Sequence, residues 1–183
     1  MRTIRIFTFL LSLALITGFQ AEAQRKKRKK HDPQKAQETM TEFKKVNSGI
    51  ANFFDSAFGY AVFPSIGKGA IGIGGAAGKG VVYKGGSVTG GVNMTQISIG
   101  FQFGGQAYSE VIFFENADAY NRFVENEFQF AAQASAVALK SGISVDAKYT
   151  DGVAVFTMAK GGLMYEASVG GQRFKFVPPN KMK

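Results

Sequence analysis

Hydrophobic residues between positions 33 and 58 recur every three or four positions, a spacing that places them on one side of a helix. Lysine, glutamate and amide residues fall on the opposite side. Asp32 before Pro33 is typical of a helix start, because aspartate accepts hydrogen bonds from the first turn and proline is tolerated there. The pattern predicts an amphipathic helix over 33–58, with a bend at Gly49. Its apolar face would consist of Met40, Phe43, Val46, Ile50, Phe53, Phe54 and Ala57.

Beyond Tyr60 the pattern changes to short β segments separated by glycines. From 97 to 103, apolar residues alternate with small or polar ones, which is typical of a strand with one buried face. "EVIFF" at 110–114 predicts a strand buried on both faces, and "KGGS" at 84–87 predicts a hairpin turn. The alternating apolar residues are Ile97, Ile99, Phe101 and Phe103.

The second half of the chain predicts one short helix and further strands. Asn116 is a suitable N-cap for a helix that directs Tyr120, Phe123 and Val124 inward. "GVAVFTMAKGGLMYEASVGGQRFKF" predicts three strands broken at two glycine pairs, whereas "FAAQASAVALKSG" suits either a helix or a strand. Together the elements predict an α+β fold: a glycine-rich, mainly antiparallel sheet, curled or barrel-like, with an N-terminal amphipathic helix and a short mid-chain helix.

The first 23 residues have the pattern of a signal peptide. Arg2 and Arg5 precede an apolar run from Ile6 to Phe19, and "AEA" at 21–23 is a small-x-small cleavage pattern. The positive charges that follow also allow an uncleaved anchor. We expect export to the periplasm or the exterior. The predicted organisation is a signal peptide (1–23), a basic leader (24–32), one domain (33–177) and a tail (178–183).

The net charge of +9 is concentrated in the leader. "RKKRKK" at 25–30 supplies six of these charges, residues 1–24 supply one, and residues 31–183 carry the remaining two. A cationic leader binds polyanions such as lipid headgroups, nucleic acids or sugar polymers. Its residues are Arg25, Lys26, Lys27, Arg28, Lys29 and Lys30.

The sequence lacks the residues that several classes of catalytic and metal-binding site need. The chain has no cysteine, and its one histidine, His31, lies beside the leader, so a thiolate site and a histidine base within the domain are excluded. The spacing of the acidic residues around the mid-chain helix favours positions on the solvated face and in the first turn of that helix over a role as paired catalytic carboxylates. We therefore expect neither an enzyme nor a cofactor. These acidic residues are Glu110, Glu115, Asp118, Glu125 and Glu127.

"SIGKGAIGIGGAAGKGVVYKGG" at 65–86 raises the question of a phosphate-binding loop. It contains G-x-G-x-x-G, but no helical pattern follows, and no acidic residue occurs between Asp55 and Glu110. The P-loop pattern fails at Ile73 and Gly80, so we expect no nucleotide. Two interpretations remain: a positive surface for anionic headgroups, or turns with solvated lysines. The lysines concerned are Lys68, Lys79 and Lys84.

Three blocks, "GYAVFPSIGKGAIGIGGAAGKGVVY", "ISIGFQFGGQAYSEVIFFENADAYNRF" and "VAVFTMAKGGLMYEASVGG", resemble successive parts of the SYLF lipid-binding domain family. The resemblance covers about Met40 to Phe176 and extends to the bacterial members of the family, which consist of a signal peptide and this domain alone. It implies a phospholipid-binding module, favours a strand within "FAAQASAVALKSG", and places lipid contacts on the N-terminal helix and basic residues. Eukaryotic relatives are tied to phosphoinositides and actin, which an exported bacterial protein would not usually meet.

We therefore predict a non-enzymatic peripheral membrane protein that binds anionic phospholipids at the bacterial cell envelope. The helix over 33–58 either inserts its apolar face into the membrane interface or docks that face on its own domain. The alternative function is a structural or scaffolding protein that binds a partner protein, not identified by the sequence, or a cell-wall polymer; nucleic acid and nucleotide are not expected. The predicted lipid contacts are the leader residues together with Phe43, Lys44, Lys45, Phe53, Phe54, Lys68, Lys79 and Lys84.

Overall fold

The computed structural model describes residues 31–71, 73–99, 106–125, 128–130, 135–139, 148–160 and 167–182. The chain divides into two units, residues 1–30 and 31–183, and all described residues belong to the second. The predicted signal peptide and the basic run at 25–30 therefore lie outside the described residues. So do Phe101, Phe103 and the glycine pair at 161–162.

The helix predicted over 33–58 is interrupted and forms two helices, α2 (Pro33–Val46) and α3 (Ile50–Ser56). At the start of α2 the Asp32 carboxylate accepts hydrogen bonds from two backbone N–H groups of the first turn, as predicted. At its end the Asn47 side chain accepts a hydrogen bond from the Gly49 N–H at 3.0 Å. The predicted bend at Gly49 is therefore a break between two helices.

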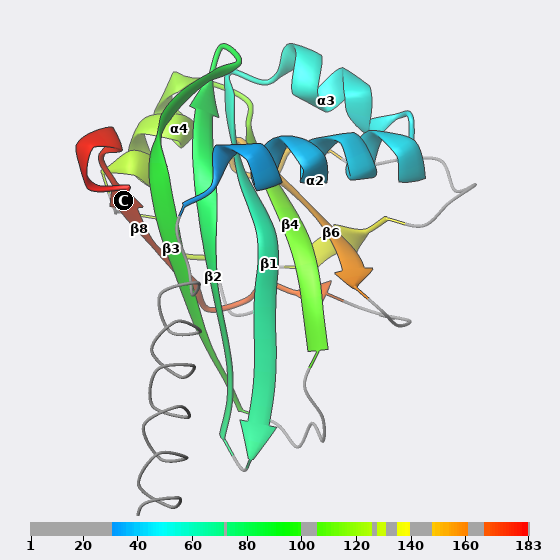
Figure 1. Ribbon diagram of the computed structural model, residues 1–183, viewed down its shortest axis with the longest axis vertical. Coiled ribbons are helices and arrows are strands. Elements are labelled where there is room, and N and C mark those ends of the chain that lie inside the picture. The colour runs from blue at the N-terminus through cyan, green and yellow to red at the C-terminus, as the bar shows by residue number, and fades with distance from the viewer. Residues whose placement is uncertain are drawn as a thin grey trace, which may run out of the picture. The chain divides into compact units, whose positions relative to one another are not determined.

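Eight strands form one mixed sheet within the described residues, in the order β7-β5-β6-β4-β1-β2-β3-β8 (Figure 1). Strands β5 and β6 are parallel, and the other pairings are antiparallel. Among the described residues no ladder joins β7 to β8, so the sheet is open and the barrel-like alternative is wrong. The strands are β1 (Gly59–Ile71), β2 (Ile73–Lys84), β3 (Ser87–Ile99), β4 (Gln106–Phe114), β5 (Ser135–Ala138), β6 (Val153–Lys160), β7 (Ala167–Ser168) and β8 (Gln172–Val177).

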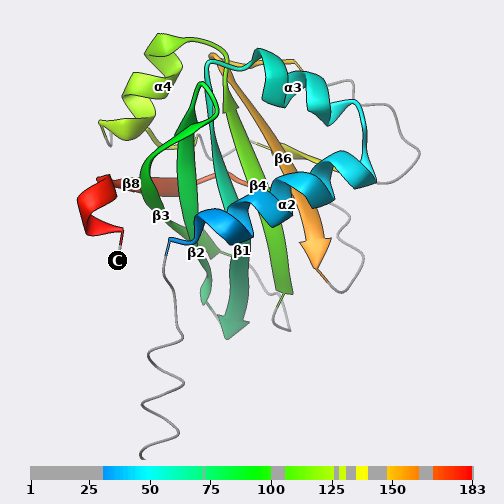
Figure 2. The same ribbon diagram turned by 45° about the horizontal axis from the view of Figure 1, so that its top comes forward.

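Apolar clusters cover both faces of the sheet. Figures 1 and 2 show α2 crossing one face, where it contacts β1 and β2, whereas the third described helix, α4 (Ala117–Val124), contacts β4 and β8. Val111 and Phe113 belong to the cluster beneath α2, while Ile112 and Phe114 belong to the cluster on the other face. The strand predicted at 110–114 is thus buried on both faces, as expected.

The glycine run at 65–86 lies in strands β1 and β2 and in the turn that follows, and not in a phosphate-binding loop. The turn predicted at 84–87 is confirmed: Gly85 and Gly86 have φ values of 54° and 76°, which glycine adopts without strain. Within β2, a Cβ on Gly80 would lie 2.8 Å from the Phe63 ring and from the Val62 carbonyl. This glycine is required for close packing of the sheet.

The remaining elements follow the sequence prediction closely. Asn116 caps α4 by accepting a hydrogen bond from the Ala119 N–H at 3.0 Å. The ambiguous segment contains the short strand β5, as the family resemblance implied, and β6 to β8 account for the C-terminal strands. A short 3-10 helix at Pro179–Lys181 follows β8. The described unit begins at His31, two residues before the predicted domain boundary.

Candidate functional site

The apolar face of α2 is covered by the sheet. Phe43 has no exposed surface and packs with Ala36, Ile50 and Val62 in the cluster beneath the helices. A side chain without exposed surface cannot contact a bilayer in this conformation. Phe43 therefore belongs to the core of the packed protein, and a lipid contact at this position stays a prediction that would require the helix to leave the sheet.

Phe53 and Phe54 are partly buried, and their rings tie α3 to the sheet. The Phe54 ring lies 4.8 Å from Phe113 and 5.2 Å from Tyr60, both in edge-to-face contact. The Phe53 ring lies 4.9 Å from Phe156. Such contacts stabilise packing by about 0.5–1.5 kcal/mol each beyond the area that they bury. Only the exposed parts of these two rings remain available to an external ligand.

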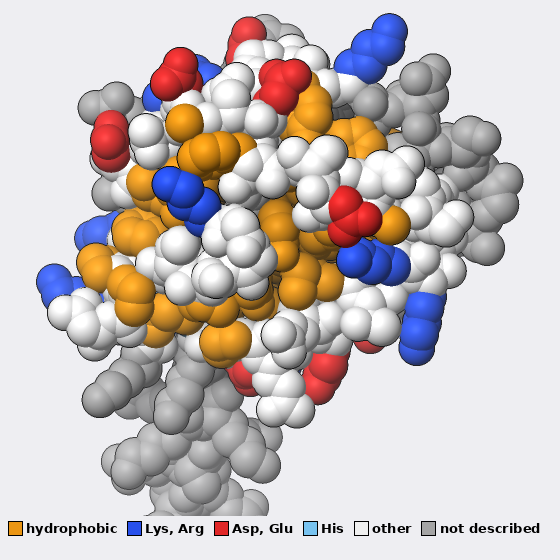
Figure 3. Space-filling model, turned by 90° about the horizontal axis from the view of Figure 1, so that it is seen from above, with side chains coloured by type: hydrophobic (Ala, Val, Ile, Leu, Met, Phe, Trp, Pro, Cys, Tyr) orange, Lys and Arg blue, Asp and Glu red, His pale blue; other side chains and the backbone are white. Residues whose placement is uncertain are grey.

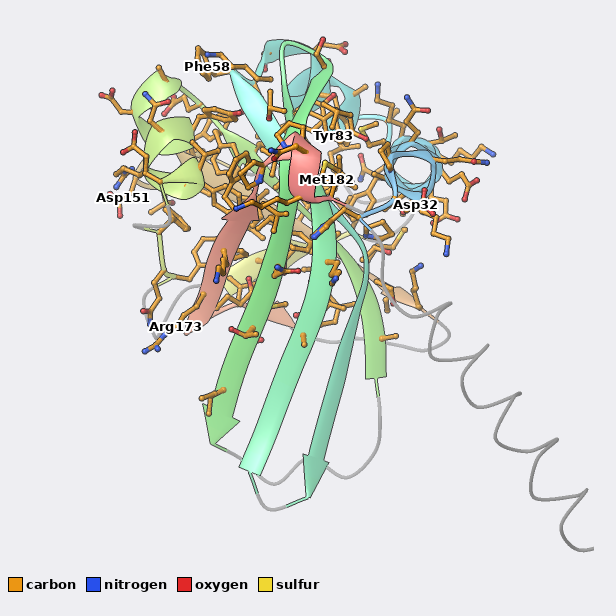
Figure 4. The ribbon with its side chains drawn as sticks, turned by 60° about the vertical axis from the view of Figure 1, so that its left-hand side comes forward. Asp32, Phe58, Tyr83, Asp151, Arg173 and Met182 are labelled. Carbon is orange, nitrogen blue, oxygen red and sulfur yellow. The ribbon has the colours of Figure 1, made fainter. Side chains whose placement is uncertain are left out.

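Two of the predicted lysines lie over aromatic rings at one end of the sheet. Lys44 Nζ is 5.0 Å from the centroid of the Phe54 ring. Lys84 Nζ is 4.7 Å from the Phe58 centroid and 5.6 Å from the Tyr120 centroid. We call these five residues the lysine–aromatic end. Figure 3 views this end from above and shows hydrophobic side chains at the surface among charged ones, and Figure 4 labels Phe58 there.

The other two lysines of the glycine run do not join this end. In the β1–β2 ladder Lys84 pairs with Gly59, whereas Lys68 pairs with Ala76 near the opposite end of the strands. Gly59 and Lys68 are nine residue steps apart along β1, which corresponds to about 30 Å at 3.3 Å per residue. Lys79 lies between them and is partly buried. The single positive surface predicted from the sequence is therefore divided along the sheet.

Acidic residues also neutralise the helical part of the predicted surface. Lys44 and Lys45 are exposed, but so are Glu38 and Glu42 on the same helix and Asp55 on α3. The described unit thus has no strongly basic helical face. Any large positive potential depends on the run at 25–30, which lies outside the described residues.

A surface pocket of about 500 Å³ opens beside α3, with groups of both charges in its wall. Burial raises the pKa of the Tyr149 hydroxyl, and the nearby Glu115 carboxylate raises it further. Phe53 contributes an aromatic wall, 5.6 Å from the Tyr149 ring. The pocket is lined by Asn52, Phe53, Ser56, Glu115, Lys148 and Tyr149. No sequence motif indicated it, because its residues come from three separate segments.

A buried polar cluster forms between β4, β6 and β8. Glu110 has no exposed surface, which corrects its assignment to the solvated face of the mid-chain helix. Gln172 Nε2 donates hydrogen bonds to Glu110 Oε2 at 3.0 Å and to the Tyr108 hydroxyl at 3.3 Å. Among the described residues, Glu110 Oε1, Thr157 Oγ1 and Gln172 Oε1 have no hydrogen-bond partner. The other acidic residues predicted as solvated, Glu115, Asp118 and Glu125, are exposed, and Glu127 lies outside the described residues.

The described residues hold no group of three His, Cys, Asp or Glu side chains that could bind a metal ion. No helix in this part of the chain is long and apolar enough to cross a membrane. Ile97, predicted on a buried face of its strand, is instead 75% exposed. The described residues therefore offer aromatic, lysine and apolar contact surfaces, together with the surface pocket beside α3.

Comparisons with known proteins agree with this description. Residues 95–177, from β3 to the end of β8, match the family model "Ysc84: Las17-binding protein actin regulator". "Beta cell expansion factor A" of Aeromonas veronii is 31% identical over 123 residues, which are 66% of this chain and 46% of that protein. The match thus spans less than half of that relative. Through this matched region the chain belongs to the Ysc84 family, the family of the SYLF domain.

Proposed function

We propose that the protein is a non-enzymatic peripheral membrane protein that binds anionic phospholipids at the bacterial cell envelope. The observation that carries the proposal is the lysine–aromatic end, where Lys44 and Lys84 lie over partly exposed rings. An aromatic ring suits the level of the lipid headgroups, and an ammonium group beside it can contact phosphates. Membership of the SYLF family supports the same function.

The electrostatic part of the affinity comes mainly from the basic run at 25–30. Residues 31–183 carry a formal charge of only +2, whereas this run adds six positive charges. A basic residue near an anionic membrane contributes about 1 kcal/mol, and salt screens the contribution within a Debye length. Binding should therefore increase with the anionic lipid content and decrease with added salt.

Vesicle co-sedimentation tests this function directly. The N-terminal residue of the purified protein is first determined. The protein is then mixed either with vesicles of phosphatidylcholine alone or with vesicles of equal parts phosphatidylcholine and phosphatidylglycerol. We expect binding to the anionic vesicles, loss of most binding when residues 25–30 are replaced by glutamine, and partial loss for Lys44→Gln with Lys84→Gln. Lys181→Gln, exposed after β8, is the matched control. Equal binding to both kinds of vesicle at high salt would contradict the proposal.

A protein partner is the second candidate, because the description of the matched family names a protein ligand. The exposed polar surface of α2 and the pocket beside α3 could form such an interface. Retention of a partner protein or of purified cell wall after detergent treatment would favour this function. Loss of retention in detergent would favour the membrane.

A further inference from the structure

The pocket beside α3 lies at the same end of the sheet as the lysine–aromatic end. Its residue Glu115 directly follows β4, whose last residue, Phe114, pairs with Gly59. Gly59 in turn pairs with Lys84 of the lysine–aromatic end, and Figure 1 shows α3 at the end of the sheet where the hairpin between β2 and β3 lies. Helix α3 contributes an aromatic ring to each of the two features. A membrane contact at this end therefore brings the pocket close to lipid headgroups.

The wall of the pocket carries one negative and one positive side chain. Glu115 and Lys148 are both exposed, and neither forms an ion pair with another described residue. A purely anionic ligand would meet the Glu115 carboxylate, and a purely cationic ligand would meet the Lys148 ammonium. Like charges in contact oppose binding, so the pocket suits a ligand that carries both charges. Its volume of about 500 Å³ is in the range of sites for small molecules.

The side chains of α3 in the pocket favour a primary ammonium as the positive group of the ligand. Ser56 donates its hydroxyl proton to the Asn52 carbonyl at 2.7 Å, so that the Ser56 oxygen keeps its lone pairs for an incoming donor. The Glu115 carboxylate is a second acceptor in the same wall. A primary ammonium has three N–H donors for these oxygens, whereas a quaternary ammonium has none. The Phe53 ring adds an aromatic surface that attracts a cation.

The segment before β6 provides donors for the negative group of the ligand. The Lys148 ammonium can contact a phosphate as a charged donor. The Tyr149 hydroxyl is buried and has no hydrogen-bond partner among the described residues. Such a group is unfavourable in a folded protein, and a phosphate oxygen that accepts its proton would restore the missing hydrogen bond.

We propose that the pocket beside α3 binds a zwitterionic phosphodiester that ends in a primary ammonium, which is the headgroup of an ethanolamine phospholipid. Glu115 and Ser56 hold the ammonium, and Lys148 and Tyr149 hold the phosphate. The inference rests on the proposed membrane binding for the source of this group. The lysine–aromatic end then supplies a general membrane contact, and the pocket adds selectivity against choline and glycerol headgroups.

Titration with soluble headgroups tests the pocket without a membrane. The probes are glycerophosphoethanolamine, glycerophosphocholine and glycerophosphoglycerol, which share one phosphodiester and differ in the group beyond it. NMR of the isotope-labelled full protein follows their binding. We expect glycerophosphoethanolamine to shift the backbone amide signals of Asn52 and Tyr149 and to bind about tenfold more tightly than the other two probes. Equal binding of the three probes, or no binding of glycerophosphoethanolamine, would overturn the proposal.

Two variants that each remove one charge test the assigned contacts. Glu115→Gln and Lys148→Gln should each weaken the binding of glycerophosphoethanolamine about tenfold, because each loses a charge-assisted hydrogen bond. The matched controls are Glu125→Gln after α4 and Lys160→Gln at the far end of β6, which lie outside the pocket and should bind as wild type. All four side chains are exposed, so the melting temperatures should stay unchanged. Wild-type affinity in both pocket variants would overturn the proposal.

Co-sedimentation then shows whether the ligand is a lipid. The vesicles contain equal parts of phosphatidylglycerol and either phosphatidylethanolamine or phosphatidylcholine. We expect tighter binding to the ethanolamine vesicles and loss of this difference in Glu115→Gln. Protein that co-sediments but does not bind glycerophosphoethanolamine would overturn the pocket and leave the proposed function intact. Protein that binds this probe but does not co-sediment would support the pocket as a site for a soluble zwitterion and overturn the proposed function.

Discussion

Gln172 on β8 donates a hydrogen bond to Glu110 on β4 at 3.0 Å, and neither side chain has any exposed surface. Strands β4 and β8 are not neighbours, since β1, β2 and β3 lie between them in the order of the sheet. The bond therefore crosses the interior and fixes the last strand against the middle of the sheet. Burial raises the pKa of Glu110 from its ordinary 4.5 to about 8, so that this carboxylic acid is neutral at pH 7.

The raised pKa of Glu110 predicts that stability falls as the pH rises. Between pH 4.5 and about 8 the folded protein holds a proton that the unfolded chain has released. The free energy of unfolding should therefore decrease by about 1.4 kcal/mol for each pH unit, or roughly 5 kcal/mol in all, and level off above pH 8. Urea denaturation at a series of pH values measures this dependence.

Glu110→Gln should remove most of that slope and raise stability at pH 8. The amide oxygen can still accept the hydrogen bond from Gln172, and the amide nitrogen adds a donor to a cluster with unpartnered acceptors on Thr157 and Gln172. Glu42→Gln, exposed on α2, is the matched control and should leave the slope unchanged. An unaltered slope in Glu110→Gln would show that another group causes the dependence.

Phe43→Ala should reduce the free energy of unfolding by about 3–5 kcal/mol, because a buried ring is replaced by a cavity. Lys45→Ala, exposed two positions further along α2, should change it by less than about 0.5 kcal/mol. Vesicle binding per folded molecule should be the same in both variants. A specific loss of vesicle binding in Phe43→Ala at wild-type stability would instead support insertion of the helix.

Two glycines of the same run should respond differently to alanine. A Cβ on Gly80 would lie 2.8 Å from the Phe63 ring and the Val62 carbonyl, so Gly80→Ala should destabilise by about 1–3 kcal/mol. A Cβ on Gly67 would meet nothing within 4 Å, so Gly67→Ala should change stability by less than about 0.5 kcal/mol. Thermal and denaturant unfolding compare the two variants. Equal losses of stability in the two variants would show that glycine is needed for backbone flexibility at both positions.

His31 should titrate below the ordinary histidine pKa of 6.5. Burial lowers its pKa first, and the positive charge of Lys79 lowers it further, although the hydrogen bond to the Gly80 carbonyl acts in the opposite direction. Its contribution to stability is present above pH 6.5 and is lost as the pH falls through the lowered pKa. Because His31 is the only histidine, NMR titration of its ring protons gives an unambiguous pKa. A value at or above 6.5 would contradict the packing of His31 against Gly80.

Lys84→Gln tests the packing of the lysine–aromatic end. The loss of its cation–π contacts with Phe58 and Tyr120 should lower stability by about 0.5–1 kcal/mol. Lys84→Arg should restore most of this stability, since a guanidinium also stacks on aromatic rings. Denaturant unfolding of the three proteins measures the effect. Equal stability of Lys84→Gln and wild type would show that the contacts contribute nothing in solution.

Much of the fold could be predicted because its signals are local. Asp32 before Pro33, Asn116 before α4 and the glycine pair at 85–86 each act within a few residues of their own position. The continuous apolar run within 110–114 identified β4 for the same reason. The open sheet could not be predicted in this way, since closure depends on whether β7 and β8, at its two ends, pair.

The candidate site was predicted less well, because side-chain exposure depends on distant partners. The helical pattern predicted the apolar face that contains Phe43. The sheet that covers this face is formed by residues far from Phe43 in sequence, such as Phe156, which lies 113 positions further along the chain. Ile97 shows the reverse case: its alternating pattern indicated burial, yet it lies beyond the end of the β3–β8 ladder. Hydrophobic periodicity identifies the apolar face of a helix or strand, but it does not identify the segment that packs against that face.

Local sequence signals established where α2 and α4 begin, which glycines form the turn at 85–86, and that the positive charge is concentrated at 25–30. Only the tertiary structure decided that Phe43 is a core residue, that Glu110 is buried, that the lysines are divided between two ends of the sheet, and that Ile97 is exposed. The physical reason is the range of the interactions. Capping and turn geometry act between adjacent residues, whereas burial and desolvation arise from segments that meet only when the chain has folded.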